Sequence, residues 1–362
     1  MKNIAPVFLF FLPAFFFSCS SEEVKISDNY IEEFVINGIS PIEVTIRNDQ
    51  SRIYIYTYPE NYNKLIETIP DIKTSEKAVL SDNGKNRYEE GFLYTVTAEN
   101  GEKKNYSVVI DMTVPKEYSF ETWDDTKGYW IPSGENSRWT SGNEGISWAL
   151  SMLEKDNKNP ENYPTRKTTE GYNGNAVLLE TIEGGTVVGR KKPLLSGNFI
   201  LGNFDIYLGI VNELAATEIG RIYPAKPKKI TGWYKYKESD KNVFISGEDA
   251  EPIPGRPDSC SMIVKFYKSD LPNGKDTTLN VGNIDDSELV IAETRKEDCS
   301  TMADDEFHPF ELELKYKPGK EQLDPQSRYK LGITFASSKD GDTFSGKIGS
   351  RLIIDEIEII DF

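Results

Sequence analysis

Four of the five tryptophans fall between residues 123 and 148, in a stretch rich in Ser, Gly and Asn. Aromatic rings can stack on the apolar C–H face of a sugar, while amide, acid and guanidinium groups hydrogen-bond to its hydroxyls. Binding residues are concentrated on loops, so this stretch is a candidate sugar-binding segment. Its candidate ligand residues are Tyr129, Trp130, Arg138, Trp139 and Trp148.

The alternative for each tryptophan is a place in the hydrophobic core. We expect Trp123 to lie in the core and Trp130 and Trp139 to be exposed, while Trp148 fits either position. Trp233 belongs to the alternating segment GWYKYKE, in which Tyr234 and Tyr236 share one face. That pattern favours a core or interface position for Trp233.

Catalytic chemistry has little support in the sequence. The only histidine, His308, precedes Pro309 at the start of a predicted strand, and HExxH, P-loop and dinucleotide motifs are absent. Zinc catalysis is excluded by the lack of imidazoles. Glycoside hydrolysis needs two carboxylates flanking the scissile bond, and Glu180 with Glu183, or Glu293, could fill those roles among 59 acidic residues.

The charge balance restricts the possible partners. Lys and Arg number 42 against 59 Asp and Glu, which gives a net charge of -17. Nucleic acid is excluded as a partner because its phosphates would be repelled. A neutral ligand such as a sugar, or a cation, is compatible with this surface.

The first residues have the pattern of a targeting segment. Lys2 precedes the apolar run IAPVFLFFLPAFFF, which is too short to span a membrane. The run ends at Ser18-Cys19 and resembles the lipobox of bacterial lipoproteins, with SSEE following as in surface-exported lipoproteins of Bacteroidetes. The resemblance implies a signal peptide over 1–19, a lipidated Cys19, an acidic tether over 20–24 and a location on the outer membrane, at the cell surface. The alternative is an ordinary secretory signal that carries an incidental cysteine.

Lipid chains on Cys19 would be the protein's only contact with the membrane. The other two cysteines, Cys260 and Cys299, would then lie in an oxidising compartment. They form either a disulfide or two buried thiols, and the sequence leaves both possibilities open.

Beyond residue 24 the chain predicts an all-β protein with two β-sandwich domains. Short runs rich in Ile, Val, Tyr, Phe and Thr are bounded by Gly, Pro, Asn and Asp. Residues 25–113 resemble an Ig-like domain of Bacteroidetes surface lipoproteins, closing in the hairpin YTVTAENGEKKNYSVVI with Asn100-Gly101 as its turn. Residues 114–116 form a linker, and 117–362 hold enough strands for a two-sheet jelly roll. The one helix expected is a short one near VNELAAT.

The second block carries a more specific resemblance. The segments FETW, RWTSGNEG, GYNGNAVLLET, KPKKITGWYKYKE and ITFASSKDGDTFSGKIGSRLIIDEIEI follow one another along the chain. Together they resemble the family called the putative carbohydrate metabolism domain, and the closing segment is the most specific part. The resemblance implies a jelly roll similar to carbohydrate-binding modules.

Similarity to such modules also implies a structural Ca²⁺ shared by an acid of the first strand and an aspartate of the last. Glu121 in SFETW and Asp355 in LIIDEIEI match these positions. The apolar alternation of the last strand slips at Asp355-Glu356, which predicts a bulge or an inward-facing acid. Hydrogen bonds from backbone N–H groups to Asp355 are the alternative to calcium. No organic cofactor is expected.

Three functions therefore stay open. The first is non-catalytic glycan binding by a surface lipoprotein, alongside other surface glycan-utilisation proteins. The second is a glycoside hydrolase or lyase with paired carboxylates, and the third is a structural or adhesive surface component.

Overall fold

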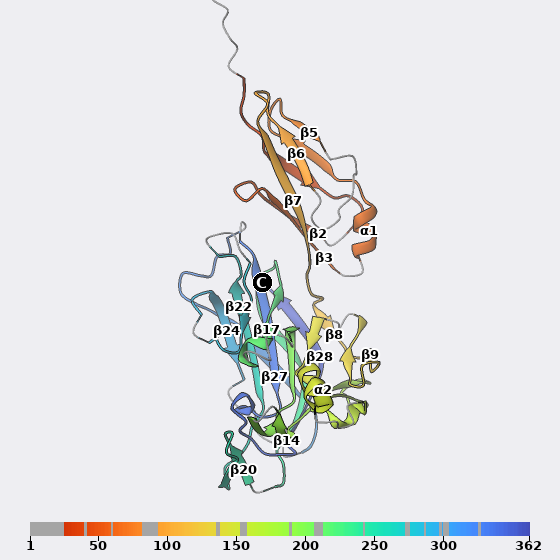
Figure 1. The fold of residues 1–362 in the computed structure, drawn as a ribbon, viewed down its shortest axis with the longest axis vertical. Helices are drawn as coiled ribbons and strands as arrows, with labels where there is room; N and C mark the ends of the chain where they lie inside the picture. Colours follow the sequence, from red (N-terminus) through yellow and green to blue (C-terminus); the bar gives the residue numbers. More distant parts are fainter. Residues whose placement is uncertain are drawn as a thin grey trace, which may run out of the picture.

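The computed structural model describes residues 25–362 except 40–41, 59–60, 82–92, 135–137, 153–157, 188–189, 206–212, 242, 272–275, 286, 297–298, 300–303 and 325–326. The predicted signal peptide, Cys19 and the tether lie outside the described residues and stay predictions. The described chain forms two β-sandwich bodies placed end to end, the first above the second in Figure 1. The predicted all-β class with two sandwiches is confirmed. Among the described residues, no helix has the length and apolarity to cross a membrane.

The smaller body packs a five-stranded sheet against a two-stranded pair. In sheet order the five strands are β2 (Ile42–Arg47), β3 (Arg52–Thr57), β7 (Lys103–Met112), β6 (Leu93–Thr97) and β5 (Val79–Ser81). The pair is β1 (Ile31–Val35) with β4 (Asp71–Thr74), and the helix α1 covers Tyr62–Glu67. Alternate residues of β6 and β7 are buried as predicted, including Tyr94, Val96, Tyr106 and Val108. This body therefore has its own hydrophobic core.

The predicted hairpin between β6 and β7 is present, but its turn differs from the prediction. Ala98 and Glu102 pair across the loop, and Gly101 N–H donates to Ala98 O at 2.9 Å. Gly101 has a φ of 91°, whereas Asn100 is not among the residues with positive φ. A turn through Asn100 followed by a left-handed glycine closes the strands, so one positive φ is enough.

The larger body is a sandwich of two mainly antiparallel sheets. The six-stranded sheet runs β12 (Thr165–Thr168), β13 (Ala176–Glu180), β28 (Arg351–Asp361), β19 (Pro227–Lys237) and β25 (His308–Glu313), with β8 (Glu117–Tyr118) beside β28. The nine-stranded sheet runs β23 (Leu279–Asn280), β17 (Thr217–Ile219), β16 (Asn198–Phe204), β27 (Tyr329–Ala336), β22 (Ser261–Lys268), β24 (Val290–Arg295) and β26 (Lys315–Tyr316), with β11 (Trp139–Thr140) beside β16 and β18 (Arg221–Ile222) beside β27. Three small pairs complete the strands: β9 (Trp123–Asp124) with β10 (Ile131–Pro132), β14 (Ile182–Val187) with β15 (Arg190–Leu195), and β20 (Val243–Ser246) with β21 (Glu251–Pro254).

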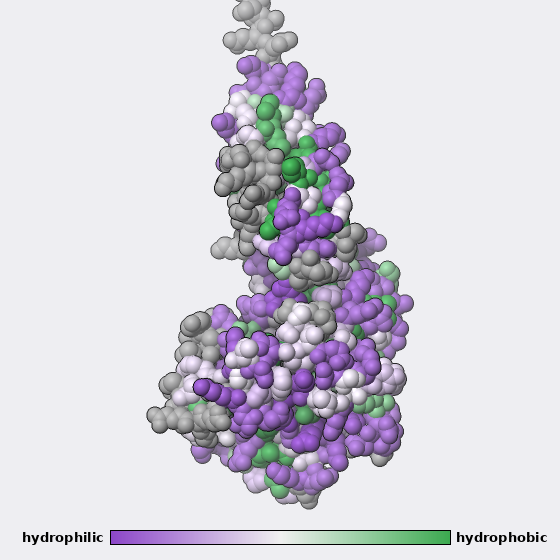
Figure 2. Space-filling view, turned by 90° about the vertical axis from the view of Figure 1, so that its right-hand side faces the viewer, coloured by the Kyte–Doolittle hydropathy of each residue, from purple (hydrophilic) through white to green (hydrophobic). Residues whose placement is uncertain are grey.

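Buried and exposed side chains alternate along the strands that line the core of the larger body. On β25 and just after it, Phe310, Leu312 and Leu314 are buried, while Glu311 and Glu313 are exposed, as the alternation predicted. One face of the six-stranded sheet thus meets the other sheet, and its opposite face remains outside. In the view of Figure 2, hydrophilic residues cover most of the larger body, and hydrophobic ones form only small patches.

Helical structure in the larger body exceeds the prediction. The predicted short helix is present as α4 (Glu213–Ala216). A longer helix, α2, covers Asn143–Met152 and begins within the tryptophan-rich stretch that we expected to form loops. Two 3-10 turns cover Pro160–Asn162 and Gly341–Thr343. The side chain of Asn143 is fully buried and donates to Thr165 O at 2.7 Å, so a tertiary contact anchors the start of α2. Such a contact cannot be read from local composition.

Contacts between the two bodies hold them together. Arg328, which precedes β27, pairs with Asp111 of β7 and lies 3.3 Å from Asp276. Its guanidinium carbon is 4.5 Å from the ring centre of Tyr54. Thr113 Oγ1 donates to Ile222 O at 3.1 Å beside these contacts. The junction is therefore packed and charged, and the linker is not its only connection.

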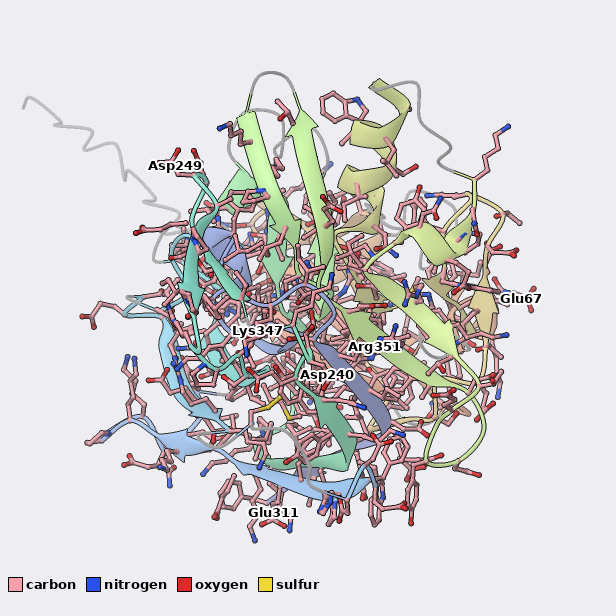
Figure 3. All side chains as sticks on the ribbon, turned by 90° about the horizontal axis from the view of Figure 1, so that it is seen from below. Glu67, Asp240, Asp249, Glu311, Lys347 and Arg351 are labelled. Atoms are coloured by element: carbon pink, nitrogen blue, oxygen red, sulfur yellow. A yellow bond between two sulfur atoms is a disulfide. The ribbon has the colours of Figure 1, made fainter. Side chains whose placement is uncertain are left out.

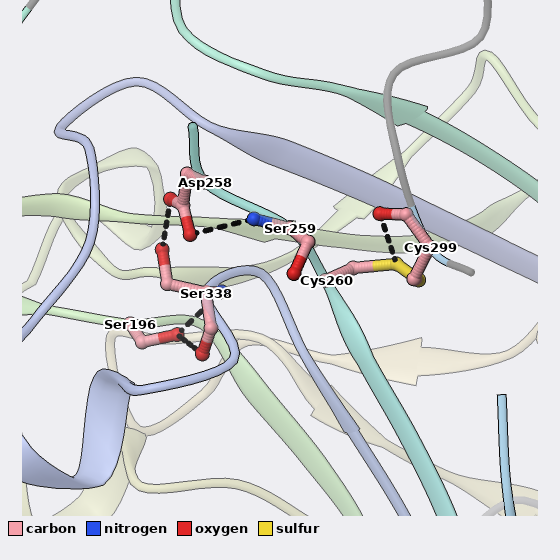
Figure 4. Close-up of a disulfide and its surroundings, with 6 residues drawn as sticks. All are labelled: Ser196, Asp258, Ser259, Cys260, Cys299 and Ser338. Carbon is pink, nitrogen blue, oxygen red and sulfur yellow. Dashed lines mark hydrogen bonds between the residues drawn. A yellow bond between two sulfur atoms is a disulfide. The ribbon is translucent and has the colours of Figure 1, made fainter. Parts of the chain in front are cut away.

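The closing motif SSKDGDTFSGKIGS serves the architecture of the larger body. Asp258 is buried and accepts a hydrogen bond from Ser338 Oγ at 2.7 Å (Figure 4). It also accepts from Ser350 Oγ at 2.8 Å and from the Lys347 N–H at 2.9 Å. Burial raises the pKa of Asp258, and these donors oppose that rise. The conspicuous serines thus satisfy one buried carboxylate.

A disulfide lies next to this network. Cys260, just before β22, is bonded to Cys299, and their Cα atoms are 5.4 Å apart (Figure 4). The structure therefore decides between the two possibilities that the sequence left open.

Candidate functional site

A groove lies on the outer face of the six-stranded sheet. Its volume is about 780 Å³. The lining residues come from β8 and the residue after it, β19, β25 and β28; they are Glu117, Tyr118, Ser119, Thr231, Gly232, Trp233, Pro309, Phe310, Glu311, Glu356, Ile357 and Glu358. Figure 3 shows Glu311 at the outer margin of this body, pointing away from the core.

Strand β19 contributes the aromatic residue of the groove. Tyr234 and Tyr236 are buried in the core, with 4% and 1% of their surfaces exposed. Trp233 directly precedes Tyr234 in the sequence, so its side chain points to the opposite, outer face. Of the two predicted positions for Trp233, core or interface, the core is therefore wrong. Trp233 is half-buried in the wall of the groove.

A second aromatic ring covers Trp233. Tyr172, in the loop between β12 and β13, stacks on it with ring centres 3.8 Å apart and planes inclined by 7°. Tyr172 remains 48% exposed. The ring of Phe307 is inclined to it by 70°, with the two ring centres 6.0 Å apart. The two stacked rings provide an apolar surface beside a polar groove, which is the combination that a sugar ring requires.

The predicted bulge in β28 is confirmed and shapes this end of the groove. Thr231 lies opposite Glu358, but Trp233 lies opposite Asp355, so two residues of β28 face Gly232 alone. Glu356 takes a φ of 48° at this point. A Cβ on Gly232 would come within 2.8 Å of the Phe310 ring, so glycine is needed here.

Asp355 is turned to the outer face yet has no exposed surface, because the loop that carries Tyr172 covers it. Its Oδ2 accepts from the Asn173 N–H at 2.9 Å, and its Oδ1 accepts from the Glu356 N–H at 2.9 Å. Burial raises the pKa of Asp355 to about 6, and the negative charges of Glu356 and Glu121 add to the rise. The backbone N–H donors act in the opposite direction.

Glu121 holds the other side of the same loop. Both carboxylate oxygens accept from the Asn175 N–H, at 3.1 and 3.2 Å. Gly174 has a φ of 82°, and a Cβ there would lie 2.3 Å from Glu121 Oε1. The two predicted calcium ligands, Glu121 and Asp355, therefore flank one loop and bind its N–H groups. In the described parts of the chain, no group of three or more His, Cys, Asp and Glu could hold a metal ion, and the calcium site stays a prediction.

The predicted tryptophan cluster does not form an exposed ligand surface. Trp139 is only 2% exposed, with its ring stacked 4.8 Å from that of Phe199, and Tyr129 is 6% exposed beside Tyr163. The expected exposure of Trp139 is wrong, because β11 places it between the two sheets. Trp123 packs against the core as predicted.

The remaining three predicted ligand residues are half-buried and lie apart from the groove lining. Trp130 Nε1 donates to Glu161 at 3.4 Å, and Lys167 Nζ lies 4.9 Å from its ring centre. Trp148 belongs to α2, and Arg138 O accepts from Arg221 Nε at 3.3 Å. Trp130 therefore already has polar partners over its ring and edge.

The carboxylates named for hydrolysis are not brought together. Glu180 pairs with Arg166 and Arg351 on the six-stranded sheet, and Glu293 pairs with Lys265 on the other sheet. Glu183 lies on the β14–β15 pair. His308 is a partly exposed residue bonded to Asp304, near the groove but outside its lining.

The fold and the groove define a β-sandwich protein with an aromatic and acidic groove on one sheet. The family model of the putative carbohydrate metabolism domain matches residues 113–360, so the chain belongs to this family. Residue 113 is close to the linker expected from the sequence, and the resemblance in the second block is thus confirmed.

Two solved structures are similar to the chain. One is described as a putative glycoside hydrolase from Bacteroides thetaiotaomicron, with 27% identity and a TM-score of 0.62 over 94% of this chain and 99% of that chain. The other, a putative glycoside hydrolase from Bacteroides vulgatus, has 27% identity and a TM-score of 0.59 over 69% of this chain and 99% of that chain. Curated proteins gave no match.

Proposed function

We propose that the protein binds a glycan in the groove of its larger domain, as a lipoprotein anchored at the cell surface through Cys19. The observation that carries the proposal is the stack of exposed Tyr172 on half-buried Trp233, at an open groove lined by carboxylates. The stack offers an apolar face to a pyranose, and the acids offer acceptors to its hydroxyls. Membership of a carbohydrate metabolism family agrees with this assignment.

A glycan array tests the proposal with three proteins. Wild type should retain at least one glycan, and Trp233→Ala should retain it about two- to tenfold more weakly, because ring stacking contributes about 0.5–1.5 kcal/mol. Trp130→Ala is the matched control, since Trp130 lies outside the groove lining. Equal retention by all three proteins would refute the site, and loss of membrane fractionation in Cys19→Ser would support the anchor.

Hydrolysis of the bound glycan is the second candidate, favoured by one observation in the groove. Glu117 of β8 and Glu358 of β28 are directly opposite each other, so their Cβ atoms lie about 4.5–5.5 Å apart. Retaining glycosidases hold their two carboxyl groups about 5–5.5 Å apart. Both structural relatives are described as putative glycoside hydrolases. Incubating each retained glycan with wild type and Glu358→Gln and measuring new reducing ends separates binding from turnover.

A further inference from the structure

Three glutamates form one row across the floor of the groove. Glu117 lies opposite Glu358, Glu358 opposite Thr231, and Thr231 opposite Glu311. All three glutamates are exposed on the outer face. With neighbouring strands about 4.8 Å apart, the row extends over about 14 Å from β8 to β25.

The negative charges of this row are only partly compensated. Lys229 Nζ lies 2.6 Å from Glu311 Oε2 and neutralises that end of the row. Within the described part of the chain, Glu117 and Glu358 have no lysine or arginine at ion-pair distance, and Lys116 instead pairs with Asp361 at 2.5 Å. Like charges directly opposite on neighbouring strands destabilise a sheet, so a cation bound between them would be favoured.

The aromatic stack stands beside this uncompensated pair. Trp233 follows Thr231 by two residues on β19, so the two side chains share the outer face about 7 Å apart. A sugar ring packed against the part of Trp233 that lines the groove would therefore place a substituent near Glu358. The groove combines an apolar surface with adjacent negative charge, and an amino sugar combines an apolar C–H face with an ammonium group.

We infer that the groove selects its glycan by charge: it prefers sugar chains with protonated amino groups and rejects chains that carry uronate or sulfate. The inference rests on the proposed function and names the ligand class of the same site. Glu117 and Glu358 determine this preference. An anionic substituent in contact with either carboxylate would weaken binding by about fivefold even at the dielectric constant of water.

Calorimetry on matched oligosaccharides tests the inference. The panel holds glycans of one backbone in N-acetylated, free-amine and uronate forms, measured at low and high salt and at a pH that protonates the amines. At low salt the amine form should bind about tenfold more tightly than the acetylated form, and high salt should reduce this difference. The double variant Glu117→Gln/Glu358→Gln should remove the difference in affinity between the amine and the acetylated forms. Glu313→Gln, an exposed acid of β25 outside the groove lining, is the matched control.

The possible outcomes separate the two proposals. If glycans bind and Trp233→Ala weakens binding, but the amine and acetylated forms bind equally or the uronate form binds best, the charge preference alone is refuted. If no oligosaccharide of the panel or array binds, the proposed function fails and the charge preference fails with it.

Discussion

Replacing Asp355 by asparagine gives a defined change in the pH dependence of stability. Asp355 has no exposed surface, and burial raises the pKa of its carboxyl to about 6 from the 3.8 of an unperturbed aspartate. The folded protein therefore binds this proton more tightly than the unfolded chain does. Asp355 thus contributes stability that is complete below about pH 4 and is lost as the pH rises through about 6. At 1.36 kcal/mol per pKa unit, the contribution is about 3 kcal/mol.

Urea unfolding of wild type and Asp355→Asn in EDTA, between about pH 4 and pH 7, measures this contribution. The variant should lack it, so the stability difference between the two proteins should change by about 3 kcal/mol across the range. Asp111 and Asp258, whose pKa values burial also raises, are present in both proteins and cancel in the difference. A constant difference at every pH would mean that Asp355 does not titrate as a buried carboxyl, and the reasoning would be refuted.

The other predictions concern calcium, the domain junction and the disulfide. If Ca²⁺ occupies the predicted site, calcium should raise the melting temperature of wild type at neutral pH and not that of Glu121→Gln; an identical response of both proteins, or none, contradicts it. Arg328→Ala leaves partly buried Asp111 unpaired, so we expect the unfolding free energy to fall by about 3 kcal/mol and two separate calorimetric transitions to appear, whereas a single unchanged transition would argue against a coupled junction. Joint replacement of Cys260 and Cys299 by serine should lower the unfolding free energy by about 2–4 kcal/mol, and an unchanged denaturant midpoint would show that the bond contributes nothing.

Features set by local alternation were predictable from the sequence. The buried and exposed faces of β25 follow directly from PFELELKYK. The bulge at Asp355-Glu356 was visible as a slip in the apolar phase of β28. In both cases the side-chain period of a strand carries the information.

The groove itself was missed because its parts are distant in sequence. Tyr172 reaches Trp233 from a loop 61 positions earlier in the numbering, and nothing local marks that contact. One signal was available: if Tyr234 and Tyr236 face the core, then Trp233 must face outward. Trp139 was wrongly predicted to be exposed because its polar neighbours suggested a loop. Its strand, β11, pairs with β16, and this pairing buries the side chain.

The most direct test of the proposed binding site is calorimetric titration of an array-selected glycan into wild type, Trp233→Ala and Trp130→Ala. We predict saturable binding to wild type and Trp130→Ala, and about two- to tenfold weaker binding to Trp233→Ala with unchanged folding by circular dichroism. Equal affinity of wild type and Trp233→Ala would contradict the assignment of the glycan to this groove.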